Sequence, residues 1–269
     1  MDHNRQTRIL ATLGPATDSV EAIGKLLDAG ANIFRLNMSH ARHDWAKTTT
    51  AHIREAAAQR GRVPAVLMDL QGPAIRTGDL PEPLELKQGD RFDFTVDATV
   101  KGDRVVGVNY PDFLNDIEVG AIILIDNGLI RMKVLNKTES VAECEVDIGG
   151  TMGSRRHINL PGTKGSLPAL PEKDRRDVAL GLELGVDYLA LSFVREAADV
   201  EELQALIQAG DHPTMVVAKI EDQHAVKRIR RIIKAADAIM VARGDLGVEC
   251  PYEELPIIQR HIVRECLTV

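Results

Sequence analysis

The sequence is poor in aromatic residues, which make up only 3% of its 269 residues, so its core must be built from aliphatic side chains. Its three cysteines, Cys144, Cys250 and Cys266, are widely spaced and form no CxxC pair. This spacing argues against a disulfide framework or a zinc site and favours a reducing cytoplasm. No apolar run approaches the roughly 20 residues that span a bilayer, and the N-terminus has no apolar signal region. We therefore predict a cytoplasmic protein without a membrane partner.

An excess of positive charge is also missing. The chain has 33 lysines and arginines against 40 aspartates and glutamates, a formal net charge of -7. This balance argues against a general nucleic-acid binder but is compatible with a local basic pocket for phosphates. The sequence contains no GxxxxGK[ST] loop, no HExxH motif and no Ser-His-Asp order, which argues against P-loop, metalloprotease and serine-hydrolase chemistry.

Strand-like and helix-like segments alternate in the first part of the chain and again in its last part. Buried strands are predicted at 8–14, 32–38, 64–70, 188–193, 215–220 and 238–244. Helices are predicted between them, including one over 224–236 and a last one over about 252–266. Apolar strands separated by helices indicate a parallel sheet covered by helices. Because a closed (β/α)₈ barrel needs eight strands, the sequence predicts an incomplete TIM-type barrel of the α/β class.

The alternation stops at Gly72 and resumes after Pro168. Between them lie short strand-like runs punctuated by Gly, Pro, Asp and Asn, with no good helix pattern. The stretch IDNGLI predicts a hairpin that turns at Asn127-Gly128. We therefore predict three segments: the first part of the barrel at 1–72, an inserted all-β lid domain at 73–168, and the second part of the barrel at 169–269.

Polar and charged side chains follow the predicted strands, where barrels of this type carry their functional residues. They are Arg35, Asn37, Ser39 and His40 at the end of the second strand, Asp69 at the end of the third, Lys219 and Glu221 at the end of the fifth, and Arg243, Gly244 and Asp245 at the end of the sixth. Residues two apart in a strand share a face, so Lys219 and Glu221 should project together. Two carboxylates beside a lysine and an arginine suit Mg²⁺ and a phosphorylated, anionic substrate.

Each of these residues, taken alone, has a simpler interpretation. Lys219 and Glu221 could form an ordinary ion pair, Asp245 could cap the following turn, and His40 could be a surface residue. Arg156 would usually belong to a solvated face. Their joint placement at successive strand ends is what favours a functional site.

Several blocks of the sequence resemble the pyruvate kinase family, and they occur in the family's order. The blocks are TRILATLGPAT, NIFRLNMSH, MDLQGPAIRTG, LIDNGLI, NLPG with LPALPEKD, LALSFVR, VVAKIED and IMVARGDLGVE. The resemblance implies a (β/α)₈ barrel with a lid domain inserted after the third strand. It implies phosphoryl transfer from phosphoenolpyruvate to ADP, which gives pyruvate and ATP in glycolysis. It also implies that the family's last barrel strands and C-terminal domain lie outside this chain.

The resemblance further implies a role for each candidate residue. It makes Lys219 and Arg35 catalytic; Arg35, Lys219, Gly244 and Asp245 substrate-binding; Asn37, His40, Arg76 and Arg156 nucleotide-binding; Glu221 and Asp245 ligands of Mg²⁺ (or Mn²⁺); and Asn37, Ser39, Asp69 and the Leu70 carbonyl ligands of K⁺. Gln71 and Ala74 stand where the family usually has a lysine and an acidic residue. The acidic residue accompanies potassium dependence, so Ala74 argues against a K⁺ requirement. Arg156 replaces a lysine, which keeps the charge but changes the donor geometry.

Two other functions stay open at this point. The chain could be a non-catalytic fragment or homologue that binds a ligand or a partner chain. With less support, it could be a Mg²⁺-dependent lyase or aldolase acting through an enolate, because such barrels share carboxylate-metal chemistry. Six parallel strands leave two open sheet edges, so we expect either a homo-oligomer or a completing chain segment.

Overall fold

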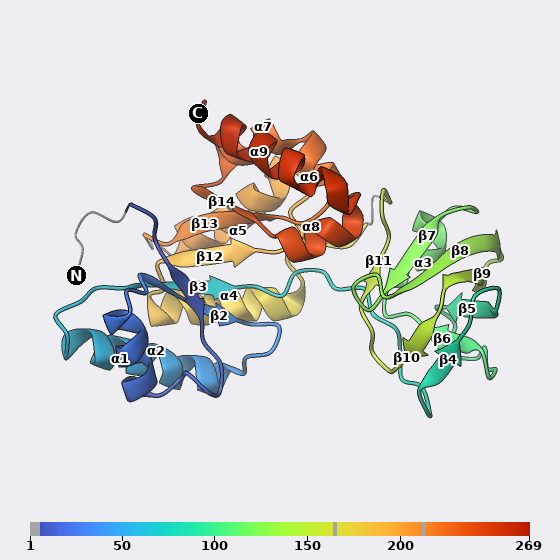
Figure 1. Cartoon of the computed structure of the whole chain (residues 1–269), viewed down its shortest axis with the longest axis horizontal. Coiled ribbons are helices and arrows are strands. Elements are labelled where there is room, and N and C mark those ends of the chain that lie inside the picture. The colour runs from blue at the N-terminus through green and yellow to red at the C-terminus, as the bar shows by residue number, and fades with distance from the viewer. Residues whose placement is uncertain (1–5, 164–165, 211–212) are drawn as a thin grey trace.

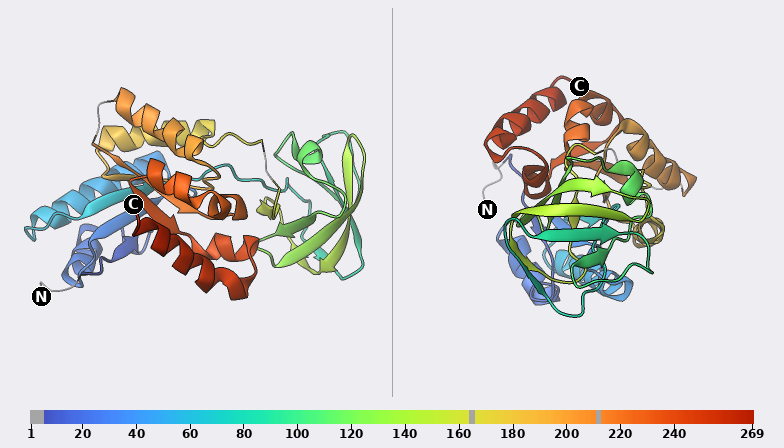
Figure 2. Two further views of the ribbon diagram at one scale, coloured as in Figure 1. Left: turned by 90° about the horizontal axis from the view of Figure 1, so that it is seen from above. Right: turned by 90° about the vertical axis from the view of Figure 1, so that its right-hand side faces the viewer.

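The computed structural model describes residues 6–163, 166–210 and 213–269. Two bodies of secondary structure lie along its long axis (Figure 1). One is a parallel sheet with its helices, which we call the half-barrel. The other is a β-rich body at one end of it, which we call the lid, and Figure 2 shows the lid from above and end-on.

Six parallel strands form the sheet of the half-barrel, in the order β1-β2-β3-β12-β13-β14. Their bounds are β1 (Leu10–Thr12), β2 (Ile33–Asn37), β3 (Ala65–Asp69), β12 (Tyr188–Leu191), β13 (Met215–Ile220) and β14 (Ala238–Val241). Every neighbouring pair is parallel. Within the described residues, β1 and β14 each pair with one strand only. The prediction of an incomplete TIM-type barrel is confirmed.

Helices follow the strands and cover the sheet. They are α1 (Val20–Asp28), α2 (His43–Ala58), α4 (Glu172–Leu184), α5 (Ala197–Ala209), α6 (Gln223–Lys227), α7 (Ile229–Ala235), α8 (Arg243–Glu249) and α9 (Leu255–Cys266), with a 3₁₀ turn, η1 (Tyr252–Glu254), before α9. Ser19 caps α1, and Gly185, in the left-handed region at φ 61°, ends α4. Phe34, Met68 and Ile232 are buried in the aliphatic core between sheet and helices. No helix of the described residues is both long and apolar enough to cross a membrane.

The lid has its own sheets and its own core. Its strands are β4 (Leu84–Leu86), β5 (Arg91–Thr95), β6 (Val105–Gly107), β7 (Ile122–Ile125), β8 (Ile130–Lys137), β9 (Val141–Ile148), β10 (Gly150–Met152) and β11 (Ile158–Asn159). They form a six-stranded sheet, β11-β7-β8-β9-β5-β6, and a small one, β10-β4. Phe92, Phe94 and Phe113 are fully buried between them and contact one another through their rings. Three of the chain's five phenylalanines therefore stabilise the lid.

The predicted hairpin at Asn127-Gly128 is confirmed. It joins β7 to β8, which pair antiparallel. Asn127 and Gly128 have φ values of 58° and 83°, the two positive values that a type I′ turn needs at its centre. The domain boundaries at 72/73 and 168/169 stay predictions.

Four details differ from the sequence-based expectations. A short helix, α3 (Phe113–Asp116), lies in the segment for which we predicted none, because Phe113 and Leu114 turn inward to the lid core. The helix predicted over 224–236 breaks at Arg228, whose φ of -109° and ψ of 12° lie outside the helical range.

Strand β1 covers only part of the predicted 8–14. Strand β14 ends at Val241 instead of residue 244, because helix α8 already begins at Arg243. This helix buries the side chain of Leu246. Asp245 therefore lies in the first turn of a short helix and not at the end of a strand.

Candidate active site

The inner face of the half-barrel sheet carries small apolar residues and then, at its carboxyl end, polar ones. Ile33, Leu67, Ala190 and Val217 belong to one apolar cluster on that face, and the residues two positions further along the same strands are Arg35, Asp69, Ser192 and Lys219. Because side chains alternate along a strand, this period of two brings the four polar side chains to the same end of the sheet.

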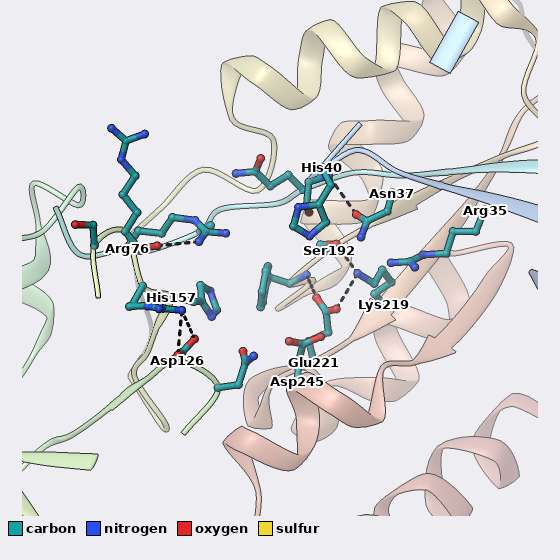
Figure 3. Close-up of a pocket in the computed structure, with 18 residues that line it drawn as sticks. Arg35, Asn37, His40, Arg76, Asp126, His157, Ser192, Lys219, Glu221 and Asp245 are labelled. Carbon is teal, nitrogen blue, oxygen red and sulfur yellow. Dashed lines mark hydrogen bonds and ion pairs between the residues drawn. The ribbon is translucent and has the colours of Figure 1, made fainter. Parts of the chain in front are cut away.

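Lys219 lies at the centre of this polar group (Figure 3). Its Nζ is 2.9 Å from Glu221 Oε1 and 3.2 Å from Asp69 Oδ1, and it donates a hydrogen bond of 2.7 Å to Ser192 Oγ. The side chain is 10% exposed. Burial alone would lower the pKa of Lys219, but the carboxylates of Glu221 and Asp69 outweigh it and raise that pKa. Lys219 therefore stays an ammonium ion beside the cleft.

Asp69 holds a second cation. Arg35 Nη2 and Nε lie 2.5 and 2.6 Å from Asp69 Oδ2, and Arg35 Nη1 donates to Thr12 Oγ1 at 3.0 Å. Asp69 is only 1% exposed, so its carboxylate acts as a buried anchor between two basic side chains. Charge-assisted bonds of this kind fix the direction of the guanidinium group.

Glu221 has one satisfied and one unsatisfied oxygen. Its Oε2 accepts a 2.6 Å hydrogen bond from the Phe193 N–H. Its Oε1 is close to Lys219 but without hydrogen-bond geometry, so this buried atom has no hydrogen-bond partner among the described residues. Burial raises the pKa of Glu221, Lys219 lowers it, and Asp245 raises it, with a net increase. A buried carboxylate whose Oε1 is held only by an ion pair, next to the carboxylate of Asp245, fits a bound hard cation such as Mg²⁺.

These groups open into a cleft of about 370 Å³ between the half-barrel and the lid. Asp126, Asn127, Arg155 and Phe193 are the non-glycine residues of the described chain with φ in the left-handed region, between 54° and 58°. All four line this cleft. Backbone strain of this kind gathers at functional sites, because the surrounding structure must enforce it.

The basic wall of the cleft comes from the lid. Arg76 Nη1 donates to the Arg155 carbonyl at 3.1 Å, and Arg156 Nη1 lies 3.2 Å from Asp126 Oδ2. Arg156 Nε is buried and has no hydrogen-bond partner in the described residues. The arrangement presents guanidinium groups to an anion that lies between lid and sheet.

The structure brings most of the predicted site residues together. The cleft is lined by Arg35, Asn37, Ser39, His40, Arg76, Arg156, Lys219, Glu221 and Asp245. Asp69 and Leu70 are 1% exposed and lie beneath it. Gly244 is exposed on α8 and is not among the residues that line the cleft. The functional roles of all these residues remain predictions.

Comparison with known proteins places the chain in a family. The family model described as the barrel domain of pyruvate kinase matches residues 4–269. The chain belongs to the pyruvate kinase family. It is 42% identical over 263 residues to pyruvate kinase isozyme G, chloroplastic, of Nicotiana tabacum, a match that covers 97% of this chain and 47% of that protein. It is 41% identical over 266 residues to the pyruvate kinase of Geobacillus stearothermophilus, covering 97% and 45%.

A solved relative has the same fold. The crystal structure of a pyruvate kinase from Cryptosporidium parvum matches with a TM-score of 0.93 and 35% identity, covering 97% of this chain and 55% of that one. The chain spans about half the length of the pyruvate kinases that it matches.

Three of the residues predicted to hold K⁺, namely Asn37, Asp69 and Leu70, already have oxygens engaged within the chain. Asn37 Oδ1 accepts the Ser39 N–H at 3.1 Å, and the Leu70 carbonyl accepts the Ser192 hydroxyl at 2.7 Å. Asp69 is paired with both Arg35 and Lys219. Internal cations therefore already neutralise the carboxylate of this set.

The sequence analysis missed several residues of the cleft. Ser192 was detectable, because it follows Ala190 at the same period of two that indicated the other strand ends. His157 and Phe193 had no such signal. Their rings lie 5.8 Å apart across the boundary between lid and half-barrel. Burial, together with the charge of Arg76, lowers the pKa of His157 and keeps its imidazole neutral.

Proposed function

We propose that this chain carries the phosphoryl-transfer site of a pyruvate kinase, which moves the phosphoryl group of phosphoenolpyruvate to ADP and gives pyruvate and ATP in glycolysis. The observation that supports it most is the buried Lys219 ammonium, fixed by Glu221, Asp69 and Ser192 at the edge of a cleft with arginines on its other walls. Phosphoryl transfer depends on positioning and on stabilising negative charge, and fixed cations do both.

Each basic residue has a distinct part in this proposal. Lys219 offsets the negative charge on the phosphoryl group as it transfers, because its ammonium cannot turn away from the cleft. Arg35, held by Asp69, binds the phosphoryl oxygens of phosphoenolpyruvate. Arg76 and Arg156 approach from the lid and bind the phosphates of ADP, with Asn37 and His40 beside the nucleotide. The backbone at Gly244 and Asp245 binds the carboxylate of the substrate.

Glu221 and Asp245 would hold a Mg²⁺ or Mn²⁺ ion, because both carboxylates line the cleft and, among the described residues, Glu221 Oε1 is engaged only in the ion pair with Lys219. When bound, such an ion neutralises negative charge on substrate oxygens. We further infer that K⁺ is not required at Asn37, Ser39, Asp69 and the Leu70 carbonyl. Arg35 and Lys219 supply positive charge to Asp69 there, and Ala74 provides no carboxylate.

The experiment is a coupled assay of pyruvate formation from phosphoenolpyruvate and ADP with Mg²⁺, with and without K⁺. Turnover that is independent of K⁺ supports both parts of the proposal. Lys219→Met should keep its circular dichroism and lose activity. Lys25→Met is the matched control, because Lys25 is exposed on α1 and pairs only with Glu21. Retained turnover in Lys219→Met would refute the role of Lys219.

The sequence analysis left a second candidate function open, that of a non-catalytic homologue or fragment that binds a ligand. In that case the chain binds the substrate or its enolate mimic, oxalate, without turnover. A thermal shift with Mg²⁺ and oxalate tests binding separately from activity. Binding without pyruvate formation would support this candidate. The absence of both binding and pyruvate formation would exclude both candidate functions.

The remaining proposals concern partners and compartment. The unpaired edges of β1 and β14 support self-association or pairing with a completing chain segment. Sedimentation at several protein concentrations tests self-association.

The three free cysteines, Cys144, Cys250 and Cys266, support a reducing compartment such as the cytoplasm.

A further inference from the structure

A second, smaller cavity of about 90 Å³ lies behind the cleft. His157, Phe193 and Glu221 line both spaces and so form the wall between them. We call the smaller one the inner cavity. Its polar lining includes Asn159 of β11, Asp222 and His224 at the start of α6, and Glu249 at the end of α8. Asn159 belongs to the lid and the other three to the half-barrel, so the inner cavity joins the two bodies.

The inner cavity contains acceptor atoms without donors. Asn159 is 6% exposed, and its Oδ1 is buried without a hydrogen-bond partner among the described residues. The Asn159 side chain interacts with the Glu249 carboxylate through its amide N–H and also with the His157 ring, but no donor of the described residues reaches Oδ1 in hydrogen-bond geometry. His224 Nε2 is also buried without a partner in the part of the chain that the structure describes. With its proton on Nδ1, this ring presents Nε2 as a further acceptor.

The charges around the inner cavity do not balance. Asp222 and Glu249 both line it, and Asp222 accepts backbone N–H groups at the start of α6, including that of Ala225 at 2.6 Å from its Oδ1. Arg195 is the guanidinium among the lining residues, and its Nη2 donates to the Leu167 carbonyl at 2.7 Å. Glu221 also lines the inner cavity but is paired with Lys219, so Asp222 and Glu249 against one guanidinium leave one negative charge. A buried charge of this kind is costly unless a cation or a proton compensates it.

We propose that the inner cavity binds an ammonium group, either NH₄⁺ or the end of a small primary amine. An ammonium ion carries one positive charge and offers N–H donors in several directions, which suits carboxylate, amide and imidazole acceptors together. The cavity is polar and has room for the ion and bridging water. No group of three or more His, Cys, Asp or Glu residues suited to a metal ion occurs in the described chain.

A bound ammonium group would connect the lid to the half-barrel. It would bridge Asn159 on the lid side to Glu249 and Asp222 on the other side. The proposal rests on the lining of the inner cavity and not on the reaction proposed for the cleft. Its test can therefore be made without substrate or Mg²⁺.

The test compares thermal unfolding in NH₄Cl, methylammonium chloride, KCl and NaCl at equal ionic strength. NH₄Cl should raise the Tm by ~3 °C more than NaCl, the shift expected when a ligand exceeds its Kd about tenfold in a chain of this size. An equal effect of methylammonium would identify a primary amine as an accepted ligand, and its failure would restrict the site to NH₄⁺.

Glu249→Gln is the decisive variant, because it removes one charge and keeps the shape. Near pH 8, where Glu249 is ionised, it should lose the ammonium-specific shift while unfolding at a higher Tm in NaCl than the parent chain. Glu253→Gln is the matched control, because Glu253 is exposed on η1 and does not line the inner cavity.

Nuclear magnetic resonance with ¹⁵N-labelled ammonium gives an independent measurement. A bound signal, with slowed proton exchange, should appear in the parent chain and in Glu253→Gln but not in Glu249→Gln. Two results would overturn the proposal. The first is equal stabilisation by KCl and NH₄Cl, because K⁺ has no hydrogen-bond donor and the site would then not select for an ammonium group. The second is no ammonium effect at all, which would mean that a proton alone compensates the two acids.

Discussion

Ser192 forms hydrogen bonds with both Lys219 and the Leu70 carbonyl. Its Oγ accepts from Lys219 Nζ at 2.7 Å and donates to the Leu70 carbonyl at 2.7 Å, so the hydroxyl fixes the ammonium of Lys219 relative to β3. Glu221 and Asp69 keep Lys219 charged, but neither of them sets its direction alone. Ser192 is therefore a positioning residue under the proposed function.

Ser192→Ala should reduce turnover more than stability. We expect kcat for pyruvate formation to fall by about tenfold or more, because a misplaced catalytic cation loses transition-state stabilisation. The free energy of unfolding should fall by about 1–3 kcal/mol, since a buried lysine loses one acceptor. Steady-state kinetics and urea unfolding measure the two effects. Ser19→Ala, which removes the hydroxyl that caps α1 and does not line the cleft, should leave kcat unchanged.

Because the pKa of Glu249 is raised in the folded chain, we expect the free energy of unfolding to depend on pH. Burial and the neighbouring Asp222 raise the pKa of Glu249 from 4.5 to about 7. A raised pKa means that the folded chain binds this proton more tightly than the unfolded chain. The contribution to stability is therefore complete below about pH 4.5 and is lost as the pH rises through about 7.

Glu249→Gln should remove this dependence. The variant and the parent chain should have similar stabilities near pH 5, while near pH 8 the variant should be more stable by about 2 kcal/mol. Urea unfolding in NaCl without ammonium measures the difference at each pH. The other charged or titratable residues that line the inner cavity are present in both chains, so the difference reports Glu249 together with its coupling to Asp222; they are His157, Arg195, Glu221, Asp222 and His224. A constant difference across this range would contradict the assignment.

At the scale of elements, the strand ends were predictable and the turns between them were not. The position at the carboxyl ends of strands brought Arg35, Asp69 and Lys219 into one predicted site, and the alternation of side chains predicted that Lys219 and Glu221 project together. Asp245 was assigned to a strand end but lies in α8. The stretch ARGDLGVE has no apolar period long enough to distinguish a short helix from a loop, and the burial of Leu246 decides it.

The lid contributions were the least predictable part of the site. His157 and Phe193 meet across the boundary between the two bodies, and no local pattern encodes a contact between residues from different bodies. The resemblance to pyruvate kinase named Arg76 and Arg156, but it gave no reason for the strained backbone at Asp126 and Arg155.

Gly72 joins β3 to the lid and touches the site directly. Its φ is 74°, and an added Cβ would lie 2.8 Å from Ser192 Cβ and 2.9 Å from Phe193 Cδ2. Gly72→Ala should therefore lower the free energy of unfolding by about 1–3 kcal/mol through strain and close contact. It should also reduce activity, because Ser192 must move.

Gly89→Ala is the control for strain alone. Gly89 has φ 85° in the lid, and no atom lies within 4 Å of its added Cβ. This variant should lose stability but keep its kcat. Equal losses of kcat in the two variants would contradict a link between Gly72 and the site. Chemical unfolding and the pyruvate assay give both quantities.

At the scale of the whole molecule, two hydrophobic cores stand side by side. The half-barrel core contains Phe34, Met68 and Ile232, and the lid core contains Phe92, Phe94 and Met132. The described cores share no residue. The cleft lies where the two bodies meet, so the geometry of the site depends on how well both remain folded.

Because the half-barrel and the lid have separate cores, we expect them to unfold in separate transitions. Each core contains one residue whose signal reports its unfolding. Trp45, the single tryptophan, packs against the half-barrel core, while Cys144 is fully buried in the lid core. Burial raises the pKa of the Cys144 thiol to about 12, so it should react only when the lid unfolds. In a background of Cys250→Ser and Cys266→Ser, thiol labelling reports the lid and tryptophan fluorescence reports the half-barrel.

Phe94→Ala should then shift one transition and not the other. Deleting a fully buried aromatic ring costs about 3–5 kcal/mol, so the urea midpoint of Cys144 labelling should fall strongly while that of Trp45 fluorescence stays near its original value. Ile53→Val in α2 is the converse control, because Ile53 is 1% exposed in the half-barrel core. It should lower only the Trp45 midpoint, by an amount that corresponds to about 1 kcal/mol. If both probes moved together in either variant, the lid and the half-barrel would be one cooperative unit.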